Sequence, residues 1–463
     1  MVRGGLLWGS FVVMLLHMTL SFTRHIFSPE NNMQASPGLT LMMRVDEYLA
    51  MALGAAALIY VFVSFLCRRR APGAWAQTRH AVRRYFSPES FILIGLFVWY
   101  LVCLVVYGDG TFRRIHGYWR YVTDLGICLL LLFPLPRLVG IGRIRIMANA
   151  VFHTAMAVST AFTAYALLAA LSGAKPVWPF NGLTIQFRPR FYPAMNANIF
   201  ASVSFSAALI ALYMIIAQKN ALRWVYTAAF ILHLAATLLT GSRGHFFALL
   251  AVLALTVFMV ARRFVSGKAL WKKLLAAALP VGAAVALLFL LRRLGILAIA
   301  AVRNTTASSA SRSLIEDSGR LPIWAASLRM MVSSVKEFFF GIPIGDFPTR
   351  VKTVMTELFG RGSRMAHAHN LILQVGVILG VPAMLAFIAF LALTAIRCVR
   401  VFAGRGRQRM EGGWFLPVAI LGTMIVNMFE PFNMLYISLM GCLFFLFSGW
   451  VMALDRGDAC LQP

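Results

Sequence analysis

Two histidines near residue 370 are the side chains in this sequence best suited to acid–base chemistry. His367 and His369 flank a single alanine, and Asn370 follows directly. Histidine titrates near neutrality, so His369 could remove a proton from a hydroxyl group while Asn370 orients the imidazole or the substrate. The alternatives are an interfacial histidine without chemistry, or a metal-binding pair. We disfavour the metal because no Asp, Glu or Cys lies close in sequence to complete such a site.

Two arginines lie where they could bind an anion. Arg243 occupies the short Gly-Ser-Arg-Gly connection between two apolar runs, and its planar guanidinium suits a phosphate group. Arg320 follows Ser318-Gly319 at an expected helix start, with Trp324 four residues later. The free backbone N–H groups and the dipole of that helix would also favour an anion. The alternatives are an arginine that anchors a helix end, for Arg243, and ordinary capping, for Arg320.

A third candidate group precedes the apolar run that begins near residue 197. Arg188 and Arg190 flank a proline, which stiffens their spacing, and Tyr192 and Asn196 follow. The tyrosine could stack on a sugar ring, although aromatic residues at a membrane interface are often only belt residues.

The composition places these residues in a membrane protein. The chain has 463 residues, of which 60% are hydrophobic and 13% charged, with a mean hydropathy of +0.79. Such a chain cannot cover itself with a water-compatible surface. Its net charge of +28 comes from short basic clusters between apolar runs, which is the positive-inside pattern rather than a nucleic-acid-binding surface. The six cysteines show no paired spacing in an exported loop, so we expect no disulfides.

The apolar runs predict an all-α polytopic protein with about twelve transmembrane helices and both termini in the cytoplasm. The first run is interpreted as a retained helix rather than a cleaved signal peptide. The expected spans are 5–22, 46–66, 90–107, 119–136, 147–171, 197–217, 222–240, 245–261, 274–291, 370–395, 413–430 and 433–452.

Segment 293–369 is too long and too polar to be a turn. We expect residues 1–292 to form nine helices, 293–369 to form a large exported loop that covers the bundle, and 370–463 to form the last three helices and a cytoplasmic C-terminus. The loop predicts two amphipathic helices, the second ended by Gly360-Arg361-Gly362. Their expected apolar faces are Trp324, Leu328, Met331 and Val335, and then Val351, Met355 and Leu358. Basic residues outnumber acidic ones in this loop, which favours an anionic ligand or anionic lipid headgroups.

Three motifs in this order resemble the O-antigen ligase family. They are Ser-Arg-Gly at 242–244, Gly-Arg at 319–320 followed by Trp324, and His-Asn at 369–370 followed by Leu-Gln at 373–374. The superfamily also holds O-antigen polymerases and bacterial oligosaccharyltransferases. The resemblance covers chiefly residues 185–385. Members often have Glu-x-Gly shortly after His-Asn, whereas this chain has Gln374-Val375-Gly376.

The resemblance implies a GT-C-like glycosyltransferase at the periplasmic face of the bacterial inner membrane. It would move a polysaccharide from undecaprenyl pyrophosphate to a sugar hydroxyl of lipid A-core. His369 would be the general base, and Arg243 and Arg320 would bind pyrophosphate. The substrate-binding candidates are Arg188, Arg190, Tyr192, Asn196, His367, Asn370 and Trp324. Because the chain contains no Asp-x-Asp motif, we expect a metal-independent, inverting displacement without a cofactor.

Two other functions remain open. An O-antigen polymerase or a protein O-oligosaccharyltransferase would use the same donor and the same residues on a different acceptor. A lipid-linked sugar flippase or transporter would do no chemistry, but such proteins usually carry ionisable residues at mid-membrane. The expected spans 147–171 and 433–452 contain no Asp, Glu, Lys or Arg.

Overall fold

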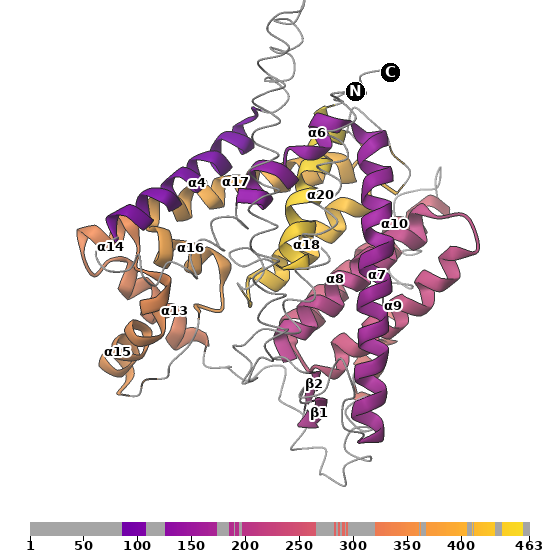
Figure 1. Ribbon diagram of the computed structural model, residues 1–463, viewed down its shortest axis with the longest axis horizontal. Coiled ribbons are helices and arrows are strands. Elements are labelled where there is room, and N and C mark those ends of the chain that lie inside the picture. Colours follow the sequence, from indigo (N-terminus) through magenta and orange to yellow (C-terminus); the bar gives the residue numbers. More distant parts are fainter. Residues whose placement is uncertain are drawn as a thin grey trace, which may run out of the picture.

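The computed structural model of the chain is a helical bundle with a smaller helical lobe at one side (Figure 1). It describes residues 86–107, 126–173, 185–188, 190–193, 197–264, a few positions between 282 and 294, 320–360, 362, 367–404, 410, 412–430 and 438–456. The expected spans 5–22 and 46–66, and most of 274–291, lie outside these residues.

Seven helices within the described residues are long and apolar enough to cross a membrane. The protein is therefore a multi-pass membrane protein, and its described residues are nearly all helical. These helices are α4 (Pro88–Val106), α7 (Ile141–Ser172), α8 (Ala197–Ala217), α9 (Leu222–Leu239), α10 (Arg243–Phe264), α17 (Val381–Phe402) and α20 (Leu439–Arg456).

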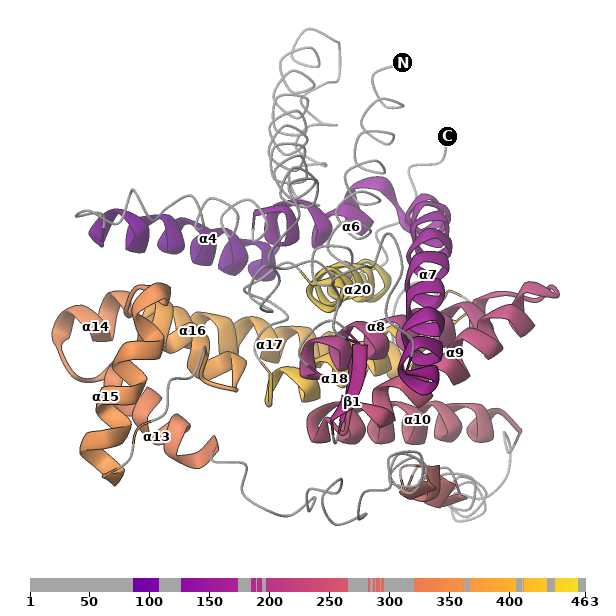
Figure 2. The same ribbon diagram turned by 60° about the horizontal axis from the view of Figure 1, so that its bottom comes forward.

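Helix α20 lies in the middle of the bundle, with α4, α7, α8 and α17 around it (Figure 2). Nearly every residue of α8 and α20 is buried, including Tyr213 on α8 and Trp450 on α20. In contrast, α4 exposes large apolar side chains such as Phe91 and Val105, as expected of a helix that faces lipid. Helices that are apolar on all sides therefore form the centre of the bundle, and the outer helices face the bilayer.

Several parts of the structure differ from the sequence prediction. Segment 119–136 is described from residue 126 and forms a short π-helix, η3 (Ile127–Leu132), followed by α6 (Leu135–Val139). Span 413–430 forms the shorter helix α18 (Phe415–Asn427). The chain is also not purely helical, because β1 (Ile185–Arg188) and β2 (Arg190–Pro193) form an antiparallel hairpin beside α7.

The expected continuous span 370–395 is broken into α16 (Leu371–Leu379) and α17 by Gly380. Gly380 has a φ of 86°, and a Cβ at this position would collide with the carbonyl group of Phe339. The break therefore lets a backbone segment from the lobe pass directly against the helix junction, which only glycine permits.

One end of the bundle is held by a cluster of ion pairs. The Arg397 guanidinium donates to Glu89 at 2.5 Å and to Asp455 at 2.7 Å, so α4, α17 and α20 are joined at this end. Glu89 and Asp455 are buried, and such buried carboxylates need a paired cation. We refer to this end as the Arg397 end.

The lobe is built from residues 320–360. It contains α13 (Arg320–Met331), α14 (Val335–Phe340), the 3₁₀ turn η4 (Ile344–Asp346) and α15 (Phe347–Phe359). Two of its helices, α13 and α15, correspond to the predicted pair. Helix α15 buries Val351 and Met355 as predicted, and it ends at Gly360 in the left-handed conformation, but Leu358 is exposed.

The predicted apolar face of α13 is largely wrong. Of that face, Met331 is buried, whereas Leu328 is 53% exposed and Val335, which belongs to α14, is 77% exposed. The buried face consists of Ile323, Ala326, Ser327, Met330 and Met331. It packs on α15 and α16, so the position of the neighbouring helices, rather than the spacing of the largest apolar residues, decided which side is buried.

Candidate functional site

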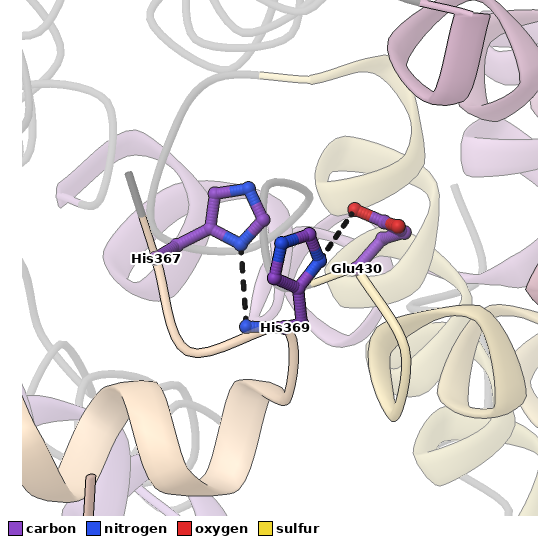
Figure 3. Close-up of side chains that lie close together, drawn as sticks. All are labelled: His367, His369 and Glu430. Carbon is purple, nitrogen blue, oxygen red and sulfur yellow. Dashed lines mark hydrogen bonds and ion pairs between the residues drawn. The ribbon is translucent and has the colours of Figure 1, made fainter. Parts of the chain in front are cut away.

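A polar cluster lies at the end of the bundle opposite the Arg397 end, and a buried carboxylate is at its centre. Glu430 follows α18, and its side chain is 1% exposed. Its Oε1 accepts from Asn198 Nδ2 at 2.8 Å and from Arg320 Nη2 at 3.0 Å, while Oε2 lies 3.5 Å from His369 Nδ1. Figure 3 shows the His369 ring turned toward Glu430. Three distant parts of the chain thus meet at one acidic side chain.

The backbone around His369 is held in an uncommon conformation. His369 has a φ of 52°, and among the described residues it is the only non-glycine with a positive φ. Asn370 begins α16, because its Oδ1 accepts from the Leu373 N–H at 3.1 Å. Just before, the Ala368 N–H donates to Gln374 Oε1 at 2.6 Å. These contacts fix His369 where a relaxed chain would not place it, which is typical of functional sites.

His367 lies beside His369 and is more deeply buried. Its Nδ1 accepts from the His369 backbone N–H at 3.3 Å, and the two ring centroids are 4.1 Å apart (Figure 3). Burial lowers the pKa of His367 to about 3; the neighbouring His369 and Arg320 act in the same direction, and the Glu430 carboxylate opposes them. His367 is therefore a neutral hydrogen-bond acceptor, whereas His369, 20% exposed, is the histidine that a substrate can reach.

The Glu430 carboxylate is ionised in this setting. Burial by itself would raise its pKa, but the contact with His369 and the charges of the surrounding basic groups, Arg320 among them, lower the pKa below the usual range. A fixed anion next to the Nδ1 of His369 favours a proton on that nitrogen, which leaves Nε2 as the basic atom.

Arg243 begins α10, after a tight connection that ends α9 at Leu239. Gly241 in this connection has a φ of 64°. A Cβ on Gly244, the next residue after Arg243, would lie 3.0 Å from the Phe429 Cβ. The Arg320 guanidinium carbon lies 5.4 Å from the centre of the same phenyl ring. The Arg243 turn and Arg320 therefore lie on Phe429, directly beside Glu430.

The structure gathers only some of the predicted site residues. His369, His367, Asn370 and Arg320 belong to this cluster, and the backbone of Arg243 adjoins it. Trp324 lies one turn after Arg320 on α13, and its buried indole Nε1 has no hydrogen-bond partner among the described residues.

The group near residue 190 is less closely linked to the cluster. Arg188 and Arg190 are paired across the β1–β2 hairpin, with Tyr192 opposite Gln186. Asn196 lies outside the described residues, and Asn198, two positions later, is the residue that reaches Glu430.

Sequence reasoning missed Glu430 and Asn198. Glu430 stands at the end of an apolar run, where an acidic residue is uncommon and often functional, so its position was a usable signal. Asn198 gave a weaker signal, because amide side chains are frequent at helix starts.

Glu430 also corrects the argument against a metal. The ligand atoms of His367, His369 and Glu430 lie within 4.8 Å of one another and could together hold a cation. The acidic ligand that is missing near the histidines in sequence is supplied by a distant segment. However, Arg320 already neutralises the same carboxylate at 3.0 Å and would repel a cation. Metal independence stays a prediction.

A comparison with protein families relates part of the chain to a known family. Residues 228–388 match the family model described as O-Antigen ligase. The matched segment contains Arg243, Arg320, His367 and His369, whereas Asn198 and Glu430 lie outside it. No curated protein matches the chain.

Proposed function

We propose that this protein is an O-antigen ligase, a glycosyltransferase-type enzyme of the O-antigen ligase/polymerase superfamily. The match of residues 228–388 to the O-antigen ligase family model supports this proposal. It would transfer a polysaccharide from undecaprenyl pyrophosphate to a sugar hydroxyl of lipid A-core. The observation that carries the proposal is the contact between His369 and the buried Glu430, with Arg320 on the same carboxylate.

The proposed reaction is a direct displacement at the anomeric carbon. Nε2 of His369 takes the proton of the acceptor hydroxyl as its oxygen attacks the sugar, while Nδ1–H faces Glu430. The bond from the anomeric carbon to the pyrophosphate oxygen breaks, so the sugar configuration inverts and the negative charge passes to the leaving diphosphate. The carboxylate of Glu430 stabilises the imidazolium that forms.

Arginines would neutralise the leaving group. Arg320 uses one N–H of Nη2 to bind Glu430, and a guanidinium has five N–H donors in total, so the same side chain can hold a phosphate and remain fixed. Arg243 begins α10, and the residue after it, Gly244, packs against the same phenylalanine. Donors fixed before the reaction stabilise charge that develops in the transition state. Arg188, Arg190 and Tyr192 remain weaker candidates for phosphate or acceptor contacts.

The site is proposed to face the periplasm. The Arg397 end and the short basic connections, including Lys219–Arg223 between α8 and α9, suit the cytoplasmic side of a bacterial inner membrane. The polar cluster of His369, Glu430 and Arg320 lies at the opposite end of the helices, where it would meet substrates that diffuse within the outer leaflet. Both termini would then be cytoplasmic, and segment 293–369 would be the exported loop.

Reconstitution of the purified protein tests the proposal. Wild-type protein in vesicles with an undecaprenyl-pyrophosphate-linked glycan should extend lipid A-core, and His369→Ala should abolish this transfer while the variant still inserts and melts normally. Arg243→Lys should also be strongly impaired, because an ammonium group cannot make a bidentate contact with phosphate. Long-chain product from His369→Ala would refute the general-base assignment.

The choice of acceptor separates the alternatives in the same assay. Transfer to a second donor-linked glycan would indicate a polymerase, and transfer to a protein hydroxyl would indicate a protein O-oligosaccharyltransferase. Movement of the lipid-linked glycan across the vesicle membrane without transfer would indicate a flippase.

A further inference from the structure

A stripe of polar side chains runs along the buried helix α8. Asn198, Ser202 and Ser206 recur at intervals of four residues and therefore share one face. The Ser202 hydroxyl donates to the Asn198 carbonyl at 3.1 Å, and the Ser206 hydroxyl donates to the Ser202 carbonyl at 2.7 Å. Because the helix is otherwise almost wholly apolar, this face is the side on which a polar contact with a neighbouring element is expected.

The partner is His245 on α10, which is completely buried. Its Nε2 lies 2.8 Å from Ser202 Oγ, and its Nδ1 lies 2.7 Å from Ser242 Oγ. The Ser202 hydroxyl proton is used by the Asn198 carbonyl, so Ser202 accepts from Nε2–H and Nδ1 accepts from the Ser242 hydroxyl. The ring also packs edge-on against Phe205, with centroids 6.0 Å apart. His245 is thus held from both sides in one orientation.

These bonds join the two halves of the proposed catalytic site. At one end, Asn198 donates to Glu430, the partner of His369. At the other end, Ser242 is the residue directly before Arg243. The path from Glu430 through Asn198, Ser202 and His245 to Ser242 is continuous, and it is buried except at Asn198, which is half-buried. The ring of His245 spans the gap between α8 and the Arg243 turn.

We propose that His245 is a positioning residue that fixes the distance between Arg243 and the His369–Glu430 pair. The inference rests on the proposed function, in which Arg243 binds the leaving diphosphate. Charge builds up on that group only as the bond breaks, so a displaced Arg243 would weaken transition-state stabilisation more than substrate binding. A displacement of about 1 Å can cost a rate factor of about 100.

The experiment compares two buried histidines. His233 on α9 is also completely buried, and its Nε2 contacts Ser159 and Thr160 on α7 at 3.4 and 3.3 Å, away from Glu430. His245→Ala should lower kcat for glycan transfer by about 10- to 100-fold with little change in the donor KM. The matched variant His233→Ala should lose stability to a similar degree while kcat stays near wild type.

Two further variants separate positioning from general destabilisation. His245→Gln keeps an N–H that can reach Ser202, so it should recover part of the kcat that His245→Ala loses. Its melting temperature should be equal to or lower than that of His245→Ala. In an Arg243→Ala background, His245→Ala should lower kcat further by less than about 2-fold, because substitutions of residues that act as one unit do not have additive effects.

Hydrogen exchange gives a readout that does not depend on activity. His245→Ala should speed exchange of the backbone amides of residues 240–246, and His233→Ala should leave them slow. Slow exchange there in His245→Ala, a kcat within about 2-fold of wild type, or fully additive effects with Arg243→Ala would each overturn the positioning role. If wild-type protein transfers no glycan to any acceptor, the proposed function fails, and the exchange data alone then decide whether His245 holds the turn.

Discussion

Replacing Glu430 with glutamine tests the centre of the proposed mechanism. Glu430→Gln keeps the shape of the side chain and its ability to accept from Asn198, but it removes the negative charge. The imidazolium that forms on His369 during proton transfer then loses its nearby anion. The variant should therefore lower kcat, whereas the donor KM should change less, because the lost interaction forms mainly in the transition state.

The size of the effect follows from the geometry. Two unit charges 3.5 Å apart, as His369 Nδ1 and Glu430 Oε2 are, attract by about 5 kcal/mol at an effective dielectric constant of about 20. The contribution is smaller here, because Arg320 shares the same carboxylate at 3.0 Å and the His369 side chain is 20% exposed. About half of that energy, ~2.5 kcal/mol, corresponds to a decrease of about 70-fold in kcat.

The assay is glycan transfer to lipid A-core in vesicles, with kcat and the donor KM measured separately. The matched control is Glu337→Gln, which removes a carboxylate from a second arginine contact in the lobe, with Arg350 at 2.8 Å. This variant should keep wild-type kcat. Glu430→Asp retains the charge but shortens the side chain, so its kcat should lie between those of wild type and Glu430→Gln.

Two results would refute the reasoning. A Glu430→Gln protein with wild-type kcat would show that the imidazolium needs no anion. An increase in the donor KM at unchanged kcat would show that the carboxylate acts only by holding Arg320 for substrate binding.

Three further predictions concern stability and metal dependence. His367 stays neutral in the folded protein down to a pKa of about 3, whereas the unfolded chain takes up a proton below about pH 6.5, so stability falls as the pH decreases through that window. Between about pH 7.5 and about pH 5 this costs about 2 kcal/mol. The melting temperature of His367→Gln should accordingly decrease less than that of wild type; equal decreases would contradict the burial argument. Asn370→Ala should lose about 1 kcal/mol of stability with the cap of α16, and Asn370→Ser should retain most of it, as thermal melts in detergent would measure. A chelator should leave glycan transfer unchanged, and a loss reversed by added divalent ions would instead assign His367, His369 and Glu430 as metal ligands.

The membrane class and part of the site could be predicted from local sequence. Apolar runs of about 20 residues specify transmembrane helices because the bilayer leaves no other way to satisfy backbone polar groups. His369 with Asn370, and Arg243 before Gly244, could be proposed as site residues because the neighbouring residue types indicate a possible chemistry. The end of α15 at Gly360 was predictable for the same reason.

Other local expectations failed where tertiary packing overrode them. The apolar spacing across 370–395 resembles one span, yet the contact between Gly380 and the Phe339 backbone divides it into two helices. Helix α13 carries apolar side chains on two faces, and only the position of α15 and α16 determines which face is buried. Periodicity by itself does not distinguish such faces.

The sequence by itself determined that the protein is a helical membrane protein with basic groups and a histidine pair at the ends of its spans. Only the tertiary structure decided that Glu430, Asn198 and His245 are joined to the candidate site residues by polar contacts. The physical reason is that a buried carboxylate or imidazole is stable only with specific polar partners, and these partners come from residues 198, 242, 320 and 369, which no local pattern connects.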